Sequence, residues 1–298
     1  GGPAAYYVPA PAVDPNNPNT WPPADEWPIP GDVNSILDPS YTPPPILVPS
    51  DAKCGTGGGL YCLSSEALIE NSLISDNVAR GVGGGVYFAD GMPSLKNCLV
   101  SGNTAFIGGG GVGSHWSAAP TIANCTIIAN KASDPNDPTR GYGGGLFCSY
   151  ESQTILVNSI LWNNEGRFGS QIAVGSKDDP TYLQRPAGLT VRFSDVQGGQ
   201  TGVAVETGRT LNWLEGNLDS DPLFVAPYFL SQTAAGQAQN SPAVDAGSAL
   251  ASVLGLDTYT TRSDNKPDAG QVDMGYHYVG EGQYQLTVTV LGGHGTAQ

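Results

Sequence analysis

Three aspartates near the carboxyl-terminal end of the sequence could bind a cation. Asp264, Asp268 and Asp273 fall within one short stretch, and Asn265 follows the first of them. Oxygen ligands of this kind suit a hard cation such as calcium, but their spacing departs from the DxDxDG…E pattern of regular calcium loops. Solvated turn carboxylates are the competing interpretation. We therefore expect no cofactor, and we keep calcium at these three aspartates as the alternative.

The sequence offers no recognisable set of catalytic residues. Inverting glycosidases need two carboxyl groups about 6.5–9.5 Å apart. The tripeptide Gly293-His294-Gly295 matches part of a glycosidase motif but has no acidic companion in the repeats described below. Bases that a lyase would need fall at unrelated repeat positions: Arg80, Lys96, Lys131 and Arg140. We predict no catalytic residue. A carbohydrate-active enzyme, either polysaccharide lyase or glycoside hydrolase, is the alternative, because its site could assemble from distant repeats.

The five cysteines, at positions 54, 62, 98, 125 and 148, cannot all pair with one another. Cys98 and Cys125 occupy the same position of the repeat, where we expect two stacked thiols. A disulfide is the alternative there, because neighbouring repeats lie within bonding distance. Cys54 and Cys62 could form a disulfide that closes a loop over the first repeat.

The middle of the chain repeats itself. Glycine-rich blocks followed by Val or Leu recur 26, 26 and 34 residues apart, starting at Gly57, Gly83, Gly109 and Gly143. A second block recurs with nearly the same spacing: NSLISDN at 71–77, NCLVSGN at 97–103, NCTIIAN at 124–130 and NSILWNN at 158–164. The last step carries an insertion, which we assign to a turn at 134–138. Two landmarks with one period indicate stacked supersecondary units.

Composition and spacing select the kind of unit. The chain has 41 glycines and only 13% charged residues, which disfavours helical repeats. A 26-residue unit with short strands fits one coil of a parallel β-helix. Apolar residues such as Leu95 and Val100 lie five apart in each unit, and strand alternation has period two, so the parity must break once between them. We predict an all-β fold, a parallel β-helix, over residues 53–200.

The first asparagine of each seven-residue block lies at this break. Asparagine tolerates the left-handed backbone conformation of a tight corner, and stacked coils lie about 4.8 Å apart. We predict that these corner residues form a ladder of hydrogen-bonded side-chain amides: Asn71, Asn97, Asn124 and Asn158. We predict that the glycine blocks serve corners with positive φ or a closely approaching backbone.

The repeats are flanked by different sequences. Residues 1–52 are rich in proline and aromatic residues, which predicts an extended arm. Residues 201–282 are predicted to form loops and short strands that cap the open end of the β-helix. Residues 283–298 begin a further module with a lone strand at 284–291. We expect the arm and this strand to join copies of the chain into a homo-assembly. The alternative is that the arm folds over its own first coil.

The charge balance excludes several partners. Lys plus Arg number 12 and Asp plus Glu number 27, which gives a formal net charge of −15. A nucleic-acid-binding protein needs a basic surface, and none is expected here. No apolar run is long enough to span a membrane. Residues 1–30 lack the pattern of a signal peptide, and the chain starts without Met, which favours a processed, exported product.

The NCTI/NSLI–N and GGG[V/L] blocks resemble the repeats of secreted bacterial right-handed β-helix proteins of the polymorphic outer-membrane type. DSDPLF, SPAVDAG and VDMGYHY resemble the carboxyl-terminal part of β-helix surface proteins with sorting anchors. The resemblance covers about residues 57–280 and implies an extracellular or cell-surface location without implying an activity. It also implies that the predicted fold is a right-handed parallel β-helix. We therefore expect a non-catalytic structural or adhesive protein, such as a filament subunit, with carbohydrate as a candidate ligand.

Overall fold

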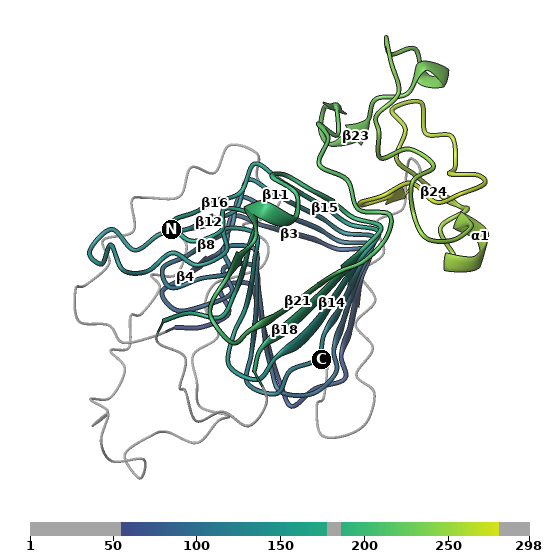
Figure 1. Cartoon of the computed structure of the whole chain (residues 1–298). Helices are drawn as coiled ribbons and strands as arrows, with labels where there is room; N and C mark the ends of the chain where they lie inside the picture. The colour runs from purple at the N-terminus through teal and green to yellow at the C-terminus, as the bar shows by residue number, and fades with distance from the viewer. Residues whose placement is uncertain (1–54, 178–185, 280–298) are drawn as a thin grey trace, which may run out of the picture. The chain divides into compact units, whose positions relative to one another are not determined.

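A computed structural model describes residues 55–177 and 186–279 of the chain (Figure 1). Short strands recur in the same order in successive turns of the chain, and each pairs in parallel with its equivalents in the neighbouring turns. We call each turn a coil. The strands at equivalent positions of the coils form four stacked sheets, which we name A to D in the order in which one coil passes through them. Sheets A, B and C surround the interior of the coils, and sheet D lies beside them (Figure 1). This arrangement confirms the predicted parallel β-helix.

Sheets A and B contain six strands each. Sheet A consists of β1 (Leu60–Leu63), β5 (Val86–Ala89), β9 (Val112–His115), β13 (Leu146–Cys148), β17 (Ile172–Val174) and β20 (Ala204–Val205). Sheet B consists of β2 (Leu68–Glu70), β6 (Ser94–Lys96), β10 (Thr121–Ala123), β14 (Gln153–Val157), β18 (Gly188–Arg192) and β21 (Thr210–Trp213). The strand stacking therefore extends past residue 200, the boundary that the sequence suggested.

Sheets C and D are smaller, with five and four strands. Sheet C consists of β3 (Leu73–Ser75), β7 (Leu99–Ser101), β11 (Thr126–Ile128), β15 (Ile160–Trp162) and β19 (Asp195–Val196). Sheet D consists of β4 (Val78–Ala79), β8 (Thr104–Ala105), β12 (Lys131–Ala132) and β16 (Glu165–Gly166). A short 3-10 helix, η4 (Gln200–Gly202), precedes β20. Each of the first four coils thus contributes one strand to every sheet.

Apolar side chains stack in columns inside the coils. The sheet B column contains Ile69, Leu95, Ile122, Leu156 and Val191. The sheet C column contains Ile74, Val100, Ile127, Leu161 and Val196. All except the partly buried Ile69 are buried. These are the apolar residues spaced five apart, and their stacking makes one core that runs through successive coils.

The glycine blocks form the tight connection from sheet D to sheet A. The first glycine of the second block, Gly83, has φ +73°, in the left-handed region where glycine is least strained. The next has no room for a side chain, because a Cβ on Gly84 would lie 2.3 Å from the Gly110 carbonyl oxygen of the next coil. Both predicted uses of glycine, positive φ and close backbone approach, therefore occur in the same block.

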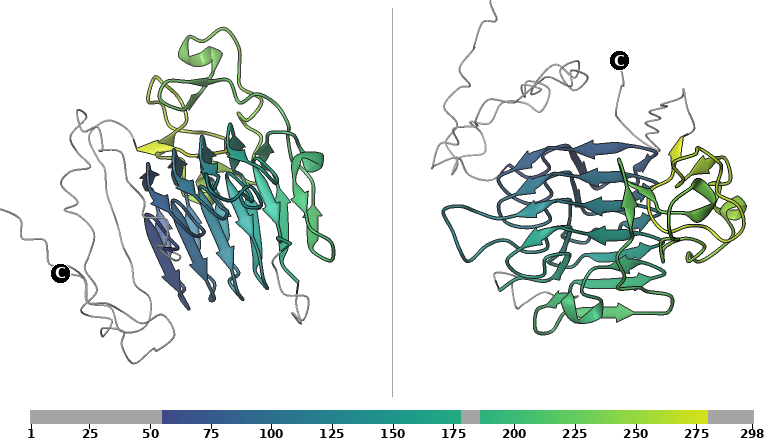
Figure 2. Two further views of the ribbon diagram at one scale, coloured as in Figure 1. Left: turned by 90° about the vertical axis from the view of Figure 1, so that its left-hand side faces the viewer. Right: turned by 90° about the horizontal axis from the view of Figure 1, so that it is seen from above.

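Residues 224–279 form a C-terminal lobe with little regular structure. It contains β22 (Phe224–Val225), β23 (Phe229–Leu230), η5 (Thr233–Ala235), α1 (Ala251–Leu254), β24 (Tyr259–Thr260) and β25 (Tyr278–Val279). The lobe lies beside several coils (Figure 2). Its Met274 and Leu230 pack with Ile160 of sheet C, and Tyr276 packs with Leu99. The apolar residues of the lobe thus cover the flank of the coils, whereas we had expected this region to cap an open end.

Several predictions concern parts of the chain outside the described residues. These are the Pro-rich arm at 1–52, Cys54, and the strand at 284–291 with its module at 283–298. Among residues 55–177 and 186–279, no helix has the length and apolar character needed to cross a membrane.

Candidate functional site

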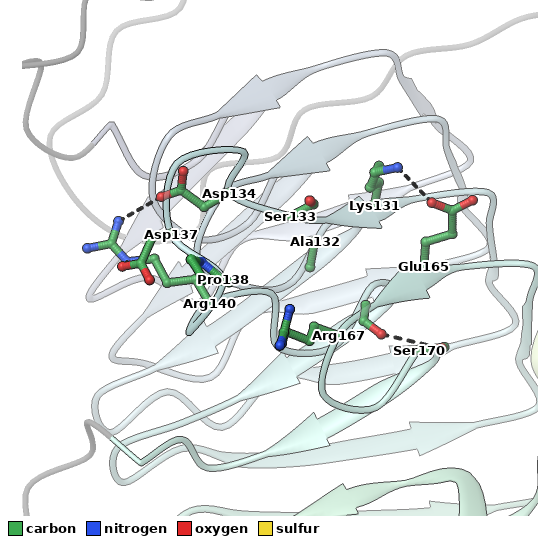
Figure 3. Close-up of a pocket in the computed structure, with 11 residues that line it drawn as sticks. Lys131, Ala132, Ser133, Asp134, Asp137, Pro138, Arg140, Glu165, Arg167 and Ser170 are labelled. Carbon is green, nitrogen blue, oxygen red and sulfur yellow. Dashed lines mark hydrogen bonds and ion pairs between the residues drawn. The ribbon is translucent and has the colours of Figure 1, made fainter.

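An open pocket of about 350 Å³ lies where strands β12 and β16 of sheet D meet the loop that follows β12 (Figure 3). This loop contains the predicted turn at 134–138 and the insertion that lengthens one step of the repeat. Six charged side chains line the pocket: Lys131, Asp134, Asp137, Arg140, Glu165 and Arg167. The irregularity in the repeat therefore creates a charged hollow on an otherwise regular surface.

The carboxylates of this pocket are all paired with basic side chains. Lys131 Nζ lies 2.8 Å from Glu165 Oε2, and this hydrogen-bonded ion pair lowers the pKa of Glu165. Arg140 lies 3.1 Å from Asp134 and 3.1 Å from Asp137. Hydrogen bonds from Thr139 and the charge of Arg140 lower the pKa of Asp137. The lowered pKa values of Glu165 and Asp137 favour their ionised forms, and neither carboxyl group is tuned to donate a proton.

The four predicted corner asparagines lie at the turn from sheet B to sheet C. Their φ angles lie between 48° and 52°, so the predicted left-handed corner is present in all four: Asn71, Asn97, Asn124 and Asn158. Their amides do not form the continuous ladder that we expected. Asn97 Nδ2 donates to Asn71 Oδ1 at 2.8 Å, but the Asn124 side-chain nitrogen is buried without a hydrogen-bond partner.

Two of these corner side chains bind the C-terminal lobe. Asn97 Oδ1 accepts a hydrogen bond from the backbone N–H of His277 at 2.7 Å, and its Nδ2 donates to the carbonyl of His277 at 2.9 Å. Asn158 Oδ1 accepts from the backbone N–H of Ser248 at 2.8 Å. The lobe thus supplies hydrogen-bond partners at these two corners, and Asn97 Nδ2 donates both to the lobe and to the neighbouring corner, Asn71. The corner column is therefore chiefly a docking surface for the lobe.

The hydrogen-bonded ladder is formed by the last asparagine of each seven-residue block. Each side-chain nitrogen donates to the side-chain oxygen of the next coil at 2.9 Å, in the order Asn77, Asn103, Asn130 and Asn164. Asn164 continues the ladder to Gln171, and Gln171 to Gln197. The sequence held a signal for this column, because all four blocks end as well as begin on asparagine. We assigned the ladder to the wrong end of the block.

Residues 52–218 match the family model described as "Right handed beta helix region". The chain belongs to this family. The match covers the coils and stops before the lobe. The comparisons with curated proteins and with solved structures gave no match.

The three aspartates that we considered for calcium are held by different partners in this right-handed β-helix, although the backbone N–H of Asp273 donates to Asp268 Oδ2 at 3.0 Å. Asp264 pairs with Arg262 through contacts of 2.8 and 2.6 Å. Asp268 instead bonds His277 Nε2 at 2.9 Å, and Asp273 accepts hydrogen bonds from Thr261 and from Gln232. Within the described ranges, no three His, Cys, Asp or Glu side chains gather as metal ligands.

Three carboxyl groups of the described residues have raised pKa values: Asp195, Asp273 and Asp245, whose pKa is raised by burial and by the charge of Asp268. Burial, followed by the charges of Asp219 and Asp221, raises the pKa of Asp195 to about 7. Its Oδ1 accepts from the backbone N–H of Ser220 at 3.1 Å, where β19 meets the start of the lobe connection. Burial and Asp268 raise the pKa of Asp273 to about 6. Asp195 and Asp273 are buried, and neither lines the pocket of sheet D.

The described cysteines are free thiols. Cys98 and Cys125 stack inside neighbouring coils and are fully buried, as we expected for two small apolar side chains. Cys62 is a half-buried free thiol. Its predicted disulfide partner, Cys54, lies outside the described residues, so the bond stays a prediction.

Proposed function

We propose that this right-handed β-helix is a non-catalytic structural or adhesive protein of a cell surface or an extracellular filament. The pairing of all three carboxylates in the sheet D pocket carries the proposal. A glycosidase needs a carboxyl group whose raised pKa keeps it protonated beside a second, ionised one. A lyase needs a free base. Here Lys131 and Arg140 are held in ion pairs with those same carboxylates. The third basic residue of the pocket, Arg167, lies over the ring of Phe168.

An extracellular location is supported by the resemblance of the repeats to those of secreted bacterial surface proteins. The same repeats suit a structural role, because each coil adds a rigid layer without requiring new surface chemistry. On such a stack of coils, a binding surface can arise from changes in a few exposed side chains, while the backbone of the β-helix stays the same.

The non-catalytic part of the proposal is tested by incubating the full chain with neutral and acidic polysaccharides. New reducing ends report hydrolysis, and unsaturated uronic products report a lyase reaction. We expect neither to form. Product formation that disappears in Glu165→Gln would contradict the proposal and place the active site in the sheet D pocket. Ser170→Ala, a change to an exposed lining residue, is the matched control.

Exposed apolar residues at both ends of the coils support homo-assembly. Among the described residues, β1 pairs only with β5, and β21 pairs only with β18. Leu63 at the end of β1 is 59% exposed, and Leu214 directly after β21 is 45% exposed. Unpaired strand edges invite a further strand, and a head-to-tail contact that does not close makes a filament.

Light scattering on the full chain tests this assembly. We expect the particle size to grow with concentration and to fall when Leu214→Lys places a charge at one end. Val253→Lys is the matched control, because Val253 is an exposed apolar residue on α1 of the lobe. A wild-type protein that stays monomeric at high concentration would refute assembly while leaving a monomeric adhesive function intact.

A further inference from the structure

The turn from sheet A to sheet B has a residue with positive φ at the same register position in each of five coils, and Gly91 adds a second one in the second coil. In chain order the five residues at the shared position are Ser64, Asp90, Trp116, Tyr150 and Gly175. Serine, aspartate and glycine are usual in such turns. Tryptophan and tyrosine are not, because a bulky side chain is crowded in the left-handed region. Two aromatic residues therefore occupy positions that the backbone disfavours for them.

Packing inside the fold does not account for Trp116. Its side chain is 53% exposed, so it contributes little to the core. The strand register places Asp90 beside it in the preceding coil and Tyr150 beside it in the following one. A strained and exposed aromatic residue of this kind points to a role at the surface.

The indole of Trp116 is held in a fixed orientation. Its ring packs in a tilted arrangement against that of Tyr150, with centroids 4.5 Å apart and planes inclined by 34°. One face of the indole is thus covered by a neighbouring ring, and a side chain held in this way loses little conformational entropy when a ligand binds.

Carboxylates flank this platform on both sides. Ser64 Oγ donates to Asp90 Oδ2 at 3.1 Å, in the coil before Trp116. Ser117 Oγ donates to Glu151 Oε2 at 3.3 Å, next to Tyr150. Each carboxylate is a hydrogen-bond acceptor with further lone pairs beside the aromatic rings.

This combination fits a sugar ring. A pyranose presents an apolar C–H face that can lie on the electron-rich face of an indole, and its hydroxyl groups point outward, where Asp90 and Glu151 could accept their hydrogen bonds. The two rings pack directly against each other at 4.5 Å and leave no space between them for a cation, unlike the rings of an ammonium-binding aromatic cage. The net charge of −15 disfavours acidic glycans.

We propose that Trp116 and Tyr150, with Asp90 and Glu151, form a binding site for a neutral pyranose unit of a polysaccharide. This site deepens the adhesive function proposed above and rests on it. It lies at the turn between sheets A and B and uses none of the residues of the sheet D pocket.

Isothermal titration of the full chain with cellohexaose, maltohexaose and xylohexaose tests the site. We expect at least one of these neutral oligosaccharides to bind. Trp116→Ala should weaken that binding by at least about tenfold, whereas Trp116→Phe should keep most of it because an aromatic face remains. Met92→Ala is the matched control, because Met92 is a 64% exposed apolar residue near the same turn. Circular dichroism checks that each variant is folded.

Three results would overturn the site: no binding of any neutral oligosaccharide, tighter binding of choline than of any sugar, or unchanged binding by Trp116→Ala. None of them contradicts a structural role for the chain. Conversely, cleavage of the bound oligosaccharide would refute the non-catalytic function but leave the site in place. The two proposals can therefore fail separately.

Discussion

Replacing Asn130 by leucine should destabilise the coils more than any change at the corner asparagines. Asn130 is fully buried at the centre of the amide ladder. Its Oδ1 accepts from the backbone N–H of Asn103 at 3.0 Å and from its side chain at 2.9 Å. Its Nδ2 donates to the carbonyl of Val100 and to Asn164 Oδ1, both at 2.9 Å. Leucine removes all four hydrogen bonds and supplies none.

The expected cost follows from these contacts. A hydrogen bond contributes about 1 kcal/mol net, and a buried polar group left without a partner costs about 1–3 kcal/mol. Four lost bonds, some of whose partners keep a second contact, give about 3–4 kcal/mol. For a protein of this size, each kcal/mol lowers the midpoint of thermal unfolding by roughly 2–4 °C. We therefore expect the midpoint of Asn130→Leu to fall by roughly 6–16 °C, measured by circular dichroism on the full chain.

Two other asparagines provide controls. Asn136→Leu changes an exposed loop residue and should leave the midpoint unaltered. Asn124→Gly removes a buried amide nitrogen that has no partner, at a φ of 52° that glycine adopts easily, so its midpoint should stay the same or rise. The reasoning is refuted if Asn130→Leu unfolds within about 1 kcal/mol of the wild type, or if Asn124→Gly is the more damaging change.

Three further predictions concern the glycine blocks, a buried acid and the lobe. Gly110→Ala should lower the free energy of unfolding in urea by about 1–3 kcal/mol, because its Cβ would lie 2.5 Å from a carbonyl oxygen of the next coil. Gly55→Ala is the control, because a Cβ there meets open space and should leave the free energy of unfolding unchanged. Equal effects of the two changes would contradict this. The folded-state pKa of Asp195, about 7, lies above that of an unfolded aspartate, about 3.9. The stability that Asp195 contributes is thus present below about pH 4 and lost as the pH rises through 7. Asp195→Asn should therefore raise the midpoint of thermal unfolding at pH 8 but not at pH 4. Equal shifts of the midpoint at the two pH values would argue against this. Gly275→Val should weaken the packing of the lobe on the coils, because a Cβ there would lie 2.8 Å from a threonine hydroxyl of β11. We expect faster proteolysis of residues 224–279, while the coils stay intact. Gly255→Val, also at positive φ but with no neighbour within 4 Å, should not speed up this proteolysis.

The coils could be predicted without the structure, because their signals in the sequence are local and repeated. The five-residue spacing of Leu95 and Val100 required one break in strand parity, and Asn97 with φ 48° makes that break. The role of the triple glycines could likewise be predicted without knowing which distant residues they meet. Each glycine is required either by the local backbone conformation or by the backbone of the next coil, one period away. Repetition in four coils turned weak local preferences into a single interpretation.

The hydrogen-bond partner of each polar side chain could not be predicted in this way, because it depends on the folded chain. Asn97 and Asn103 occupy the two ends of the same block, and local sequence does not distinguish an amide that continues a ladder from one that binds a lobe. The lobe reaches Asn97 through His277, which lies 180 residues further along the chain. The different partners of Asp264 and Asp268 arose in the same way, because Arg262 and His277 each take one carboxylate. Backbone conformation is fixed by neighbours in the sequence, whereas a side-chain hydrogen bond is fixed by whichever segment the completed fold brings within about 3 Å.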